Sequence, residues 1–115
     1  MQNSQIVKIK FTPEFKRNLR ALSKKYHHIR SDIQPIIDQI QSGQFIGDRI
    51  TGANFVIFKV RTKNSDILKG KSSGYRIIYQ RKTPSLAILL TIYSKLDQSD
   101  ISVEKIRQIL REYEK

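Results

Sequence analysis

The chain of 115 residues holds 22 Lys or Arg against 10 Asp or Glu, which gives a formal net charge of +12 and an isoelectric point near 10.2. This length suffices for a modest core, and we expect a single domain over residues 1–115. The charge predicts an acidic or polyanionic partner, and the absence of cysteine excludes disulfides, thiol catalysis and thiolate metal sites.

The chain begins with the pattern of a strand followed by a helix. Residues 6–11 alternate between apolar and polar side chains, as a strand does. Thr12 then offers an N-cap and Pro13 the favoured first helical position, so a helix is predicted over residues 13–26. Its apolar stripe is Phe15, Leu19, Leu22 and Tyr26.

A second helix is predicted directly afterwards, which would form a helical hairpin with the first. Ser31 or Asp32 is expected to cap it, and Gln34 fits a capping box with Ser31. Because proline is tolerated only in a first turn, Pro35 argues for a start no earlier than Ser31. Gly43 is the natural end.

The second half of the chain has the pattern of a sheet followed by one helix. Residues 44–52 indicate a loop with a short edge strand, and strands are predicted over 54–62, 75–81 and 86–95. The last of these is nearly all apolar, as is typical of a central strand. Ser102 is expected to cap the final helix. The order β-α-α-β-β-β-α predicts an α+β fold, with a mostly antiparallel sheet, the helical hairpin packed on it and a C-terminal helix.

Positive charge is concentrated in residues 59–82, which hold eight Lys or Arg and one acid, Asp66. Lys59 and Arg61 lie two apart in a predicted strand and therefore project from the same face. Arg76 lies at the start of the next strand. A basic face on a sheet suits a polyanion such as RNA.

The same region carries a resemblance to a known family. The block Ser72-Ser73-Gly74-Tyr75-Arg76-Ile77-Ile78-Tyr79 follows an alternating basic strand and precedes a strand ending Thr91-Ile92-Tyr93-Ser94-Lys95. With these motifs the chain resembles, over nearly its whole length, the RelE/ParE superfamily of toxin–antitoxin toxins, and within it the RelE and HigB type. Members of that type cut messenger RNA on the ribosome.

The resemblance implies particular site residues and partners. It places Lys59 and Arg61 at the two alternating basic positions of the RelE strand, Arg76 at the arginine of the Gly-Tyr-Arg block and Lys95 at the basic residue after the last strand. The residues expected to bind RNA are Lys63, Lys69, Lys71, Tyr79 and Tyr93, although a packing role is an equal alternative for the two tyrosines. The implied partners are the ribosome with its messenger RNA and a cognate antitoxin with an acidic inhibitory segment; operator DNA would be bound only through the antitoxin complex.

The chemistry expected of such a set needs no metal or other cofactor. No cluster of His, Asp and Glu stands at metal-ligand spacing, and the adjacent His27 and His28 are expected in a surface turn. RNA supplies its own nucleophile, the ribose 2′-hydroxyl, so the protein must supply a base, positive charge and an acid. Lysine serves as a base only if its pKa falls from about 10.4 towards about 7–8. We expect Lys59 or Arg61 near the attacking hydroxyl, Arg76 on the phosphate, and Lys95 stabilising charge or aiding departure of the leaving group.

Three functions fit the sequence, in order of preference. The first is a metal-independent endoribonuclease toxin that cuts messenger RNA on the translating ribosome. The second is a ParE-like gyrase poison without catalysis, and the third is a non-catalytic nucleic-acid binder. Residues 1–5 lack the pattern of a secretory signal, and no apolar run approaches the ~20 residues of a membrane span, so a cytoplasmic protein with no membrane partner is expected.

Overall fold

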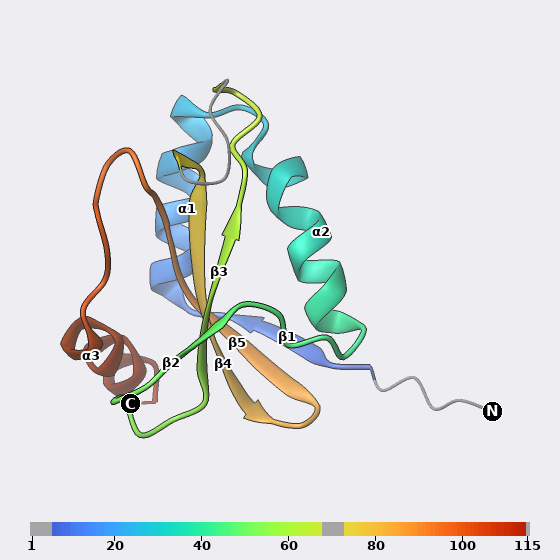
Figure 1. The fold of residues 1–115 in the computed structure, drawn as a ribbon, viewed down its shortest axis with the longest axis vertical. Helices are drawn as coiled ribbons and strands as arrows, with labels where there is room; N and C mark the ends of the chain where they lie inside the picture. Colours follow the sequence, from blue (N-terminus) through green and yellow to red (C-terminus); the bar gives the residue numbers. More distant parts are fainter. Residues whose placement is uncertain (1–5, 68–72, 115) are drawn as a thin grey trace.

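The computed structural model describes residues 6–67 and 73–114, which form three helices and a five-stranded sheet (Figure 1). The elements are β1 (Lys8–Phe11), α1 (Pro13–Lys25), α2 (Ile29–Gln41), β2 (Asp48–Ile50), β3 (Ile57–Thr62), β4 (Tyr75–Thr83), β5 (Leu86–Ser94) and α3 (Val103–Tyr113). Across the sheet the order is β1-β5-β4-β3-β2, and only the β1–β5 pair is parallel among these described strands. The α+β class and the mostly antiparallel sheet are confirmed. The short edge strand expected within residues 44–52 is β2, which makes five strands in place of the four in the predicted order.

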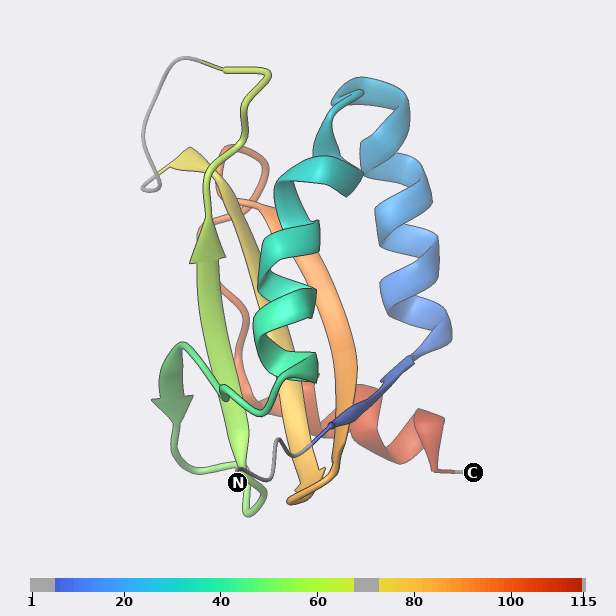
Figure 2. The ribbon, with the colours of Figure 1, turned by 90° about the vertical axis from the view of Figure 1, so that its right-hand side faces the viewer.

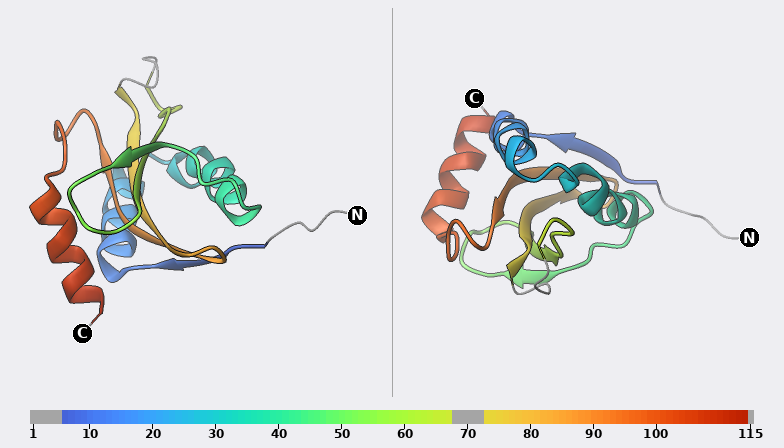
Figure 3. Two further views of the ribbon diagram at one scale, coloured as in Figure 1. Left: turned by 60° about the horizontal axis from the view of Figure 1, so that its bottom comes forward. Right: turned by 90° about the horizontal axis from the view of Figure 1, so that it is seen from above.

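The sheet is covered on both faces by apolar layers. Helices α1 and α2 lie on one face and α3 on the other (Figures 2 and 3). The first layer includes Phe15, Tyr26, Ile29, Ile33, Ile40, Val60, Tyr75, Ile77, Tyr79 and Leu89. The second includes Ala53, Ile57, Ile78, Ile88, Leu90, Tyr93, Ile106, Ile109 and Leu110. Alternate residues of β3 and β4 therefore point to different helical layers.

Strand β5 is the central strand that its apolar run predicts, because it lies between β1 and β4 and is buried from Ala87 to Ser94. Strand β1 pairs only with its first half, through Leu86 to Leu89. Helix α1 protects the remaining edge: the Asn18 side-chain amide donates to Thr91 Oγ1 (3.0 Å) and to the carbonyl of Ile92 (3.4 Å). The backbone groups of β5 beyond β1 are thus held within the fold rather than offered as a free edge.

Two of the three helix starts agree with the sequence prediction. The Thr12 side chain accepts a hydrogen bond from the N–H of Phe15 (3.0 Å), and Ser102 accepts one from the N–H of Lys105 (3.0 Å). Both are N-caps, and each satisfies an N–H group that the first helical turn leaves unpaired.

The predicted start of α2 is wrong. The helix begins at Ile29, so Pro35 lies inside it, on the exposed surface. A distant segment fixes this earlier start, since the N–H of His28 donates to Asp66 Oδ2 (3.0 Å). Asp32 does not cap the helix; its carboxylate accepts from the N–H (2.9 Å) and hydroxyl (3.0 Å) of Ser65. Tertiary contacts outweigh the local preference of proline for a first turn.

Candidate nucleic-acid interface

Three of the four predicted catalytic residues lie on the α3 side of the sheet. Residues 57, 59 and 61 of β3 point to this side, and so do 76, 78 and 80 of β4. Helix α3 covers one part of this side of the sheet, where it packs against Ile57 of β3 and Ile78 of β4. The part beyond α3 holds Lys59, Arg61 and Arg76, with Tyr93 of β5 beside them. We call Lys59, Arg61, Arg76 and Lys95 the basic face.

Arg61 and Arg76 are direct cross-strand partners in the β3–β4 ladder. Their Cα atoms are therefore about 4.5–5.5 Å apart, as in any antiparallel pair. Like charges placed opposite each other disfavour the pairing unless an anion lies between them. Arg61 is exposed and Arg76 is only 5% exposed, so the pair offers one guanidinium at the surface and one within the protein. This arrangement suits a phosphate.

The buried guanidinium of Arg76 is held among backbone and aromatic groups. Its Nη1 donates to the carbonyl of Tyr75 (3.3 Å). Its cross-strand neighbour in β5 is Tyr93, and its charge acts to lower the pKa of that phenol. A guanidinium fixed in this way keeps its orientation, which favours recognition of a planar or tetrahedral anion.

Tyr93, Lys59 and Asp100 form a small cluster next to the two arginines. Asp100 Oδ1 accepts from the Tyr93 hydroxyl (3.2 Å) and lies 3.4 Å from Lys59 Nζ. Burial, followed by the charge and hydrogen bond of Asp100, raises the pKa of Tyr93 to about 12, against the opposing charge of Arg76. Burial also opposes ionisation of Asp100, but the Lys59 charge and hydrogen bonds from Ile101, Tyr93 and Lys59 outweigh it, and the pKa of Asp100 is lowered. The phenol thus stays neutral and donates, while the carboxylate stays charged.

Lys95 lies at the same end of the sheet, where its N–H donates to the carbonyl of Gly74 (2.9 Å). Its Nζ donates to the carbonyl of Ser99, which tethers it to the segment leading into α3. Lys63 is exposed directly after β3. The predicted RNA-binding residues Lys69 and Lys71 fall outside the described residues.

The RNA-binding role predicted for Tyr79 is wrong. It stands three positions after Arg76, so in a strand the two side chains point to opposite faces. Tyr79 is fully buried on the side of α1 and α2, where it stacks on Phe58 with 5.3 Å between ring centroids. Its hydroxyl donates to the carbonyl of Ile46 (2.6 Å). A nucleobase has no access to this ring.

His27 and His28 lie in an exposed turn, as predicted. His28 Nδ1 is 2.6 Å from Asp66 Oδ1, a contact between segments that the sequence does not place together. The hydrogen bond with Asp66, aided by its charge, raises the pKa of His28, and the same bond lowers the pKa of Asp66. Over residues 6–67 and 73–114, no group of three or more His, Cys, Asp or Glu is placed to hold a metal ion.

Two glycines allow neighbouring backbone segments to approach the backbone of β3 closely. A Cβ on Gly47 would lie 2.6 Å from the carbonyl oxygen of Lys59, and Gly47 has a φ of +108°. A Cβ on Gly74 would collide with the carbonyl of Thr62. Gly74 is therefore needed for the close contact between β3 and the start of β4, beyond the turn that its type suggests.

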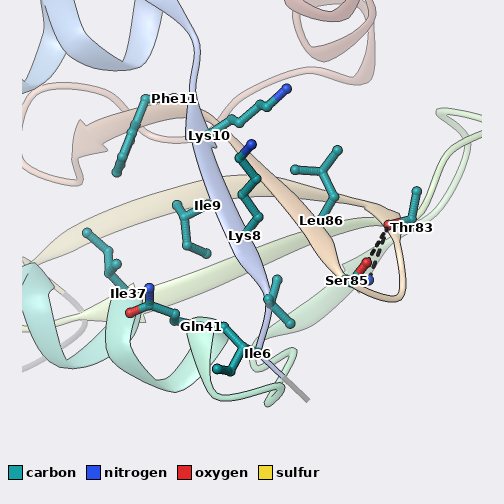
Figure 4. Close-up of a pocket in the computed structure, with 11 residues that line it drawn as sticks. Ile6, Lys8, Ile9, Lys10, Phe11, Ile37, Gln41, Thr83, Ser85 and Leu86 are labelled. Atoms are coloured by element: carbon teal, nitrogen blue, oxygen red, sulfur yellow. Dashed lines mark hydrogen bonds between the residues drawn. The ribbon is translucent and has the colours of Figure 1, made fainter.

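A separate groove of about 930 Å³ runs along β1, at the opposite end of β5 from the basic face. Figure 4 shows that Lys8 and Lys10 point to one side of β1 and Ile9 to the other. Ile37 and Leu86 are among the other lining residues. None of the predicted site residues within 6–67 and 73–114 contributes to this groove.

Sequence reasoning missed Asp100. The signal for it was weak, because an aspartate after a strand and before a helix cap is ordinarily part of a solvated loop. Only the path of residues 95–102 brings it back over β3 and β5.

No protein-family model matches the sequence, and no curated protein matches it. In addition, no helix of the described part of the chain is long and apolar enough to cross a membrane.

Proposed function

We propose that this protein is a metal-independent endoribonuclease of the RelE and HigB type, which cuts messenger RNA on the translating ribosome and is held inactive by an antitoxin. The observation that carries the proposal is the direct pairing of Arg61 with Arg76, beside Lys59 and Tyr93 on one open end of the sheet. These are the positions through which the sequence resembles RelE. A solvated charged face would not require an arginine as deeply buried as Arg76.

The proposed reaction is an in-line transfer within the RNA. The 2′-oxygen of one ribose forms a bond to the adjacent phosphorus, and the bond from that phosphorus to the 5′-oxygen of the next nucleotide breaks. The products are a 2′,3′-cyclic phosphate and a 5′-hydroxyl end. One proton leaves the 2′-hydroxyl and one is given to the departing 5′-oxygen, so no oxidant, reductant or water is consumed.

Each member of the basic face has a role in this reaction. Arg76 clamps the phosphate from within the protein, and the exposed Arg61 binds it from the β3 side. Lys59 accepts the proton of the 2′-hydroxyl once the Asp100 carboxylate is replaced by substrate. Lys95, on the far side of Arg76 at the end of β5, stabilises the charge on the leaving oxygen.

The proposed antitoxin follows from the charge. With a net charge of +12, the free protein repels itself, and an acidic segment laid across the basic face would both neutralise it and exclude RNA.

The proposal is tested by inducing the protein in growing bacteria and mapping new RNA 5′ ends and DNA breaks in the same cultures. Cuts within translated codons are expected, and double-strand DNA breaks without such cuts would instead support a gyrase poison. With purified protein and programmed ribosomes, cleavage is expected to leave 2′,3′-cyclic phosphate and 5′-hydroxyl ends, as attack by the 2′-hydroxyl requires. Products with 5′-phosphate ends would refute the mechanism.

A further inference from the structure

The segment between β5 and α3 carries two carboxylates that both bind lysines. Asp97 Oδ1 lies 3.3 Å from Lys25 Nζ of α1, away from the basic face. Asp100 Oδ1 lies 3.4 Å from Lys59 Nζ and 3.2 Å from the Tyr93 hydroxyl, within the basic face. The two residues thus have the same charge and the same loop but different surroundings.

Asp100 is not needed to begin the helix that follows. Ser102 caps α3 through its side-chain oxygen. The Asp100 side chain is 61% exposed, and an exposed ion pair contributes little to stability. An incoming RNA phosphate, which carries one negative charge as the carboxylate does, can therefore displace it at low cost.

The groups that Asp100 binds are those that a phosphate oxygen would use. Ammonium and phenol donors bind carboxylate and phosphate oxygens with the same geometry. The Lys59 side chain is 25% exposed, so its Nζ faces an opening rather than the core. A phosphate held between Arg61 and Arg76 would lie next to it and compete for the same donors.

We propose that Asp100 is an internal competitor for the phosphate site, which lowers the affinity of the basic face for RNA held by backbone charge alone. The inference rests on the proposed RNA-cleaving function and names a specificity-determining residue for it. Free RNA must displace the Asp100 carboxylate from Lys59 and Tyr93 without further contacts that would offset the loss of those two interactions. RNA presented by a ribosome is held by additional contacts and displaces it readily.

The test is binding of a fluorescein-labelled eight-nucleotide RNA that carries 2′-O-methyl groups throughout and so cannot be cut. Fluorescence anisotropy would compare the wild type, Asp100→Asn and the matched control Asp97→Asn, which changes the net charge equally. We expect Asp100→Asn to bind up to about fivefold more tightly than Asp97→Asn, the factor that corresponds to ~1 kcal/mol. Its logarithmic salt dependence should steepen by about 0.7, the value for one more phosphate contact in a single strand.

Two further variants identify the cause. In a Lys59→Ala background, Asp100→Asn should give a smaller gain, because only the Tyr93 hydroxyl remains as a contested donor. Asp100→Ser provides a second neutral variant, and circular dichroism melting confirms that each variant is folded. A role of Asp100 in merely holding the loop predicts the opposite sign, since a looser loop would bind RNA more weakly.

Several results would overturn the proposal. They are equal or weaker binding by Asp100→Asn relative to Asp97→Asn, a gain of undiminished size without Lys59, and absence of RNA binding by all variants. A wild type that binds RNA but cuts none on ribosomes would refute the proposed function alone, because the binding comparison does not depend on cleavage.

Discussion

Replacing Arg76 should separate chemistry from binding, because this arginine is buried whereas the other lysines and arginines that the structure describes are more exposed. A unit charge about 4 Å from a phosphate is worth ~4 kcal/mol at an effective dielectric constant near 20, and ~1 kcal/mol in water. Arg76 belongs to the first case and the exposed Arg61 to the second. We therefore expect Arg76→Ala to slow cleavage by about a hundred- to a thousandfold, within the ~2.7–4 kcal/mol typical of a lost transition-state donor. Arg61→Ala should cost only about fivefold.

The assay is single-turnover cleavage on programmed ribosomes, with ribosome binding measured on the same samples. The matched control is Arg81→Ala, which removes the same charge from the same strand. The Arg81 guanidinium lies 4.7 Å from the ring centroid of Phe45, on the opposite side of the sheet. This control should leave cleavage unchanged and lower thermal stability.

Arg76→Lys should restore part of the activity, because it keeps the charge but not the fork of donors. An Arg76→Ala protein that is folded and fully active would refute the assignment. Equal losses for Arg76→Ala and Arg81→Ala would show that charge alone, irrespective of face, controls cleavage.

Three more substitutions test other parts of the structure. Lys59→Arg keeps a positive charge but removes a group able to accept a proton. Ribosome binding should therefore persist, while single-turnover cleavage falls at least about a hundredfold. Unchanged cleavage would exclude Lys59 as the base. Tyr79→Phe should lower the free energy of unfolding by about 1 kcal/mol in urea denaturation, because it removes the buried hydrogen bond to the Ile46 carbonyl. Fluorescence anisotropy should show an unchanged RNA affinity. A weaker affinity would indicate that Tyr79 contacts RNA. His28→Gln should destabilise the protein most between about pH 4 and 6.5, where His28 is protonated and Asp66 is ionised. The pKa of His28 is raised in the folded protein, so its contribution to stability is lost as the pH rises through that pKa. The pKa of Asp66 is lowered, so its contribution is lost as the pH falls through that pKa. Melting temperatures from pH 3 to 9 check this, and a constant difference across that range would contradict the role of the pair.

The sequence predicts most elements because their signals are local. The caps at Thr12 and Ser102 and the apolar run of β5 each depend on a few neighbouring residues. The start of α2 could not be predicted in this way, because it depends on Asp66, which is 38 residues from His28. The preference of proline for a first turn describes an isolated helix, and here the contact with the Asp66 carboxylate places the start of α2 earlier than that preference predicts.

The candidate site was predictable in part. Alternation along β3 places Lys59 and Arg61 together, but the direct pairing of Arg61 with Arg76 is a matter of register, which the long connection between the strands does not specify. The same alternation, applied from Arg76 to Tyr79, assigns them to opposite faces, so that error was avoidable from the sequence. The position of Asp100 depends on how residues 95–102 fold back over the sheet, and no periodicity encodes that path.

The length of β4 and β5 has a practical consequence for following this protein on a large target. The basic face lies where β4 starts and β5 ends, and the turn joining them closes at the other end, where Thr83 pairs with Leu86. Pro84, exposed in that turn, is eight residues from Arg76, or roughly 26 Å along an extended strand. Because the sequence contains no cysteine, Pro84→Cys would give the chain a single thiol. A dye or cross-linker attached there would report the orientation of the bound protein from a position remote from the residues proposed to contact RNA.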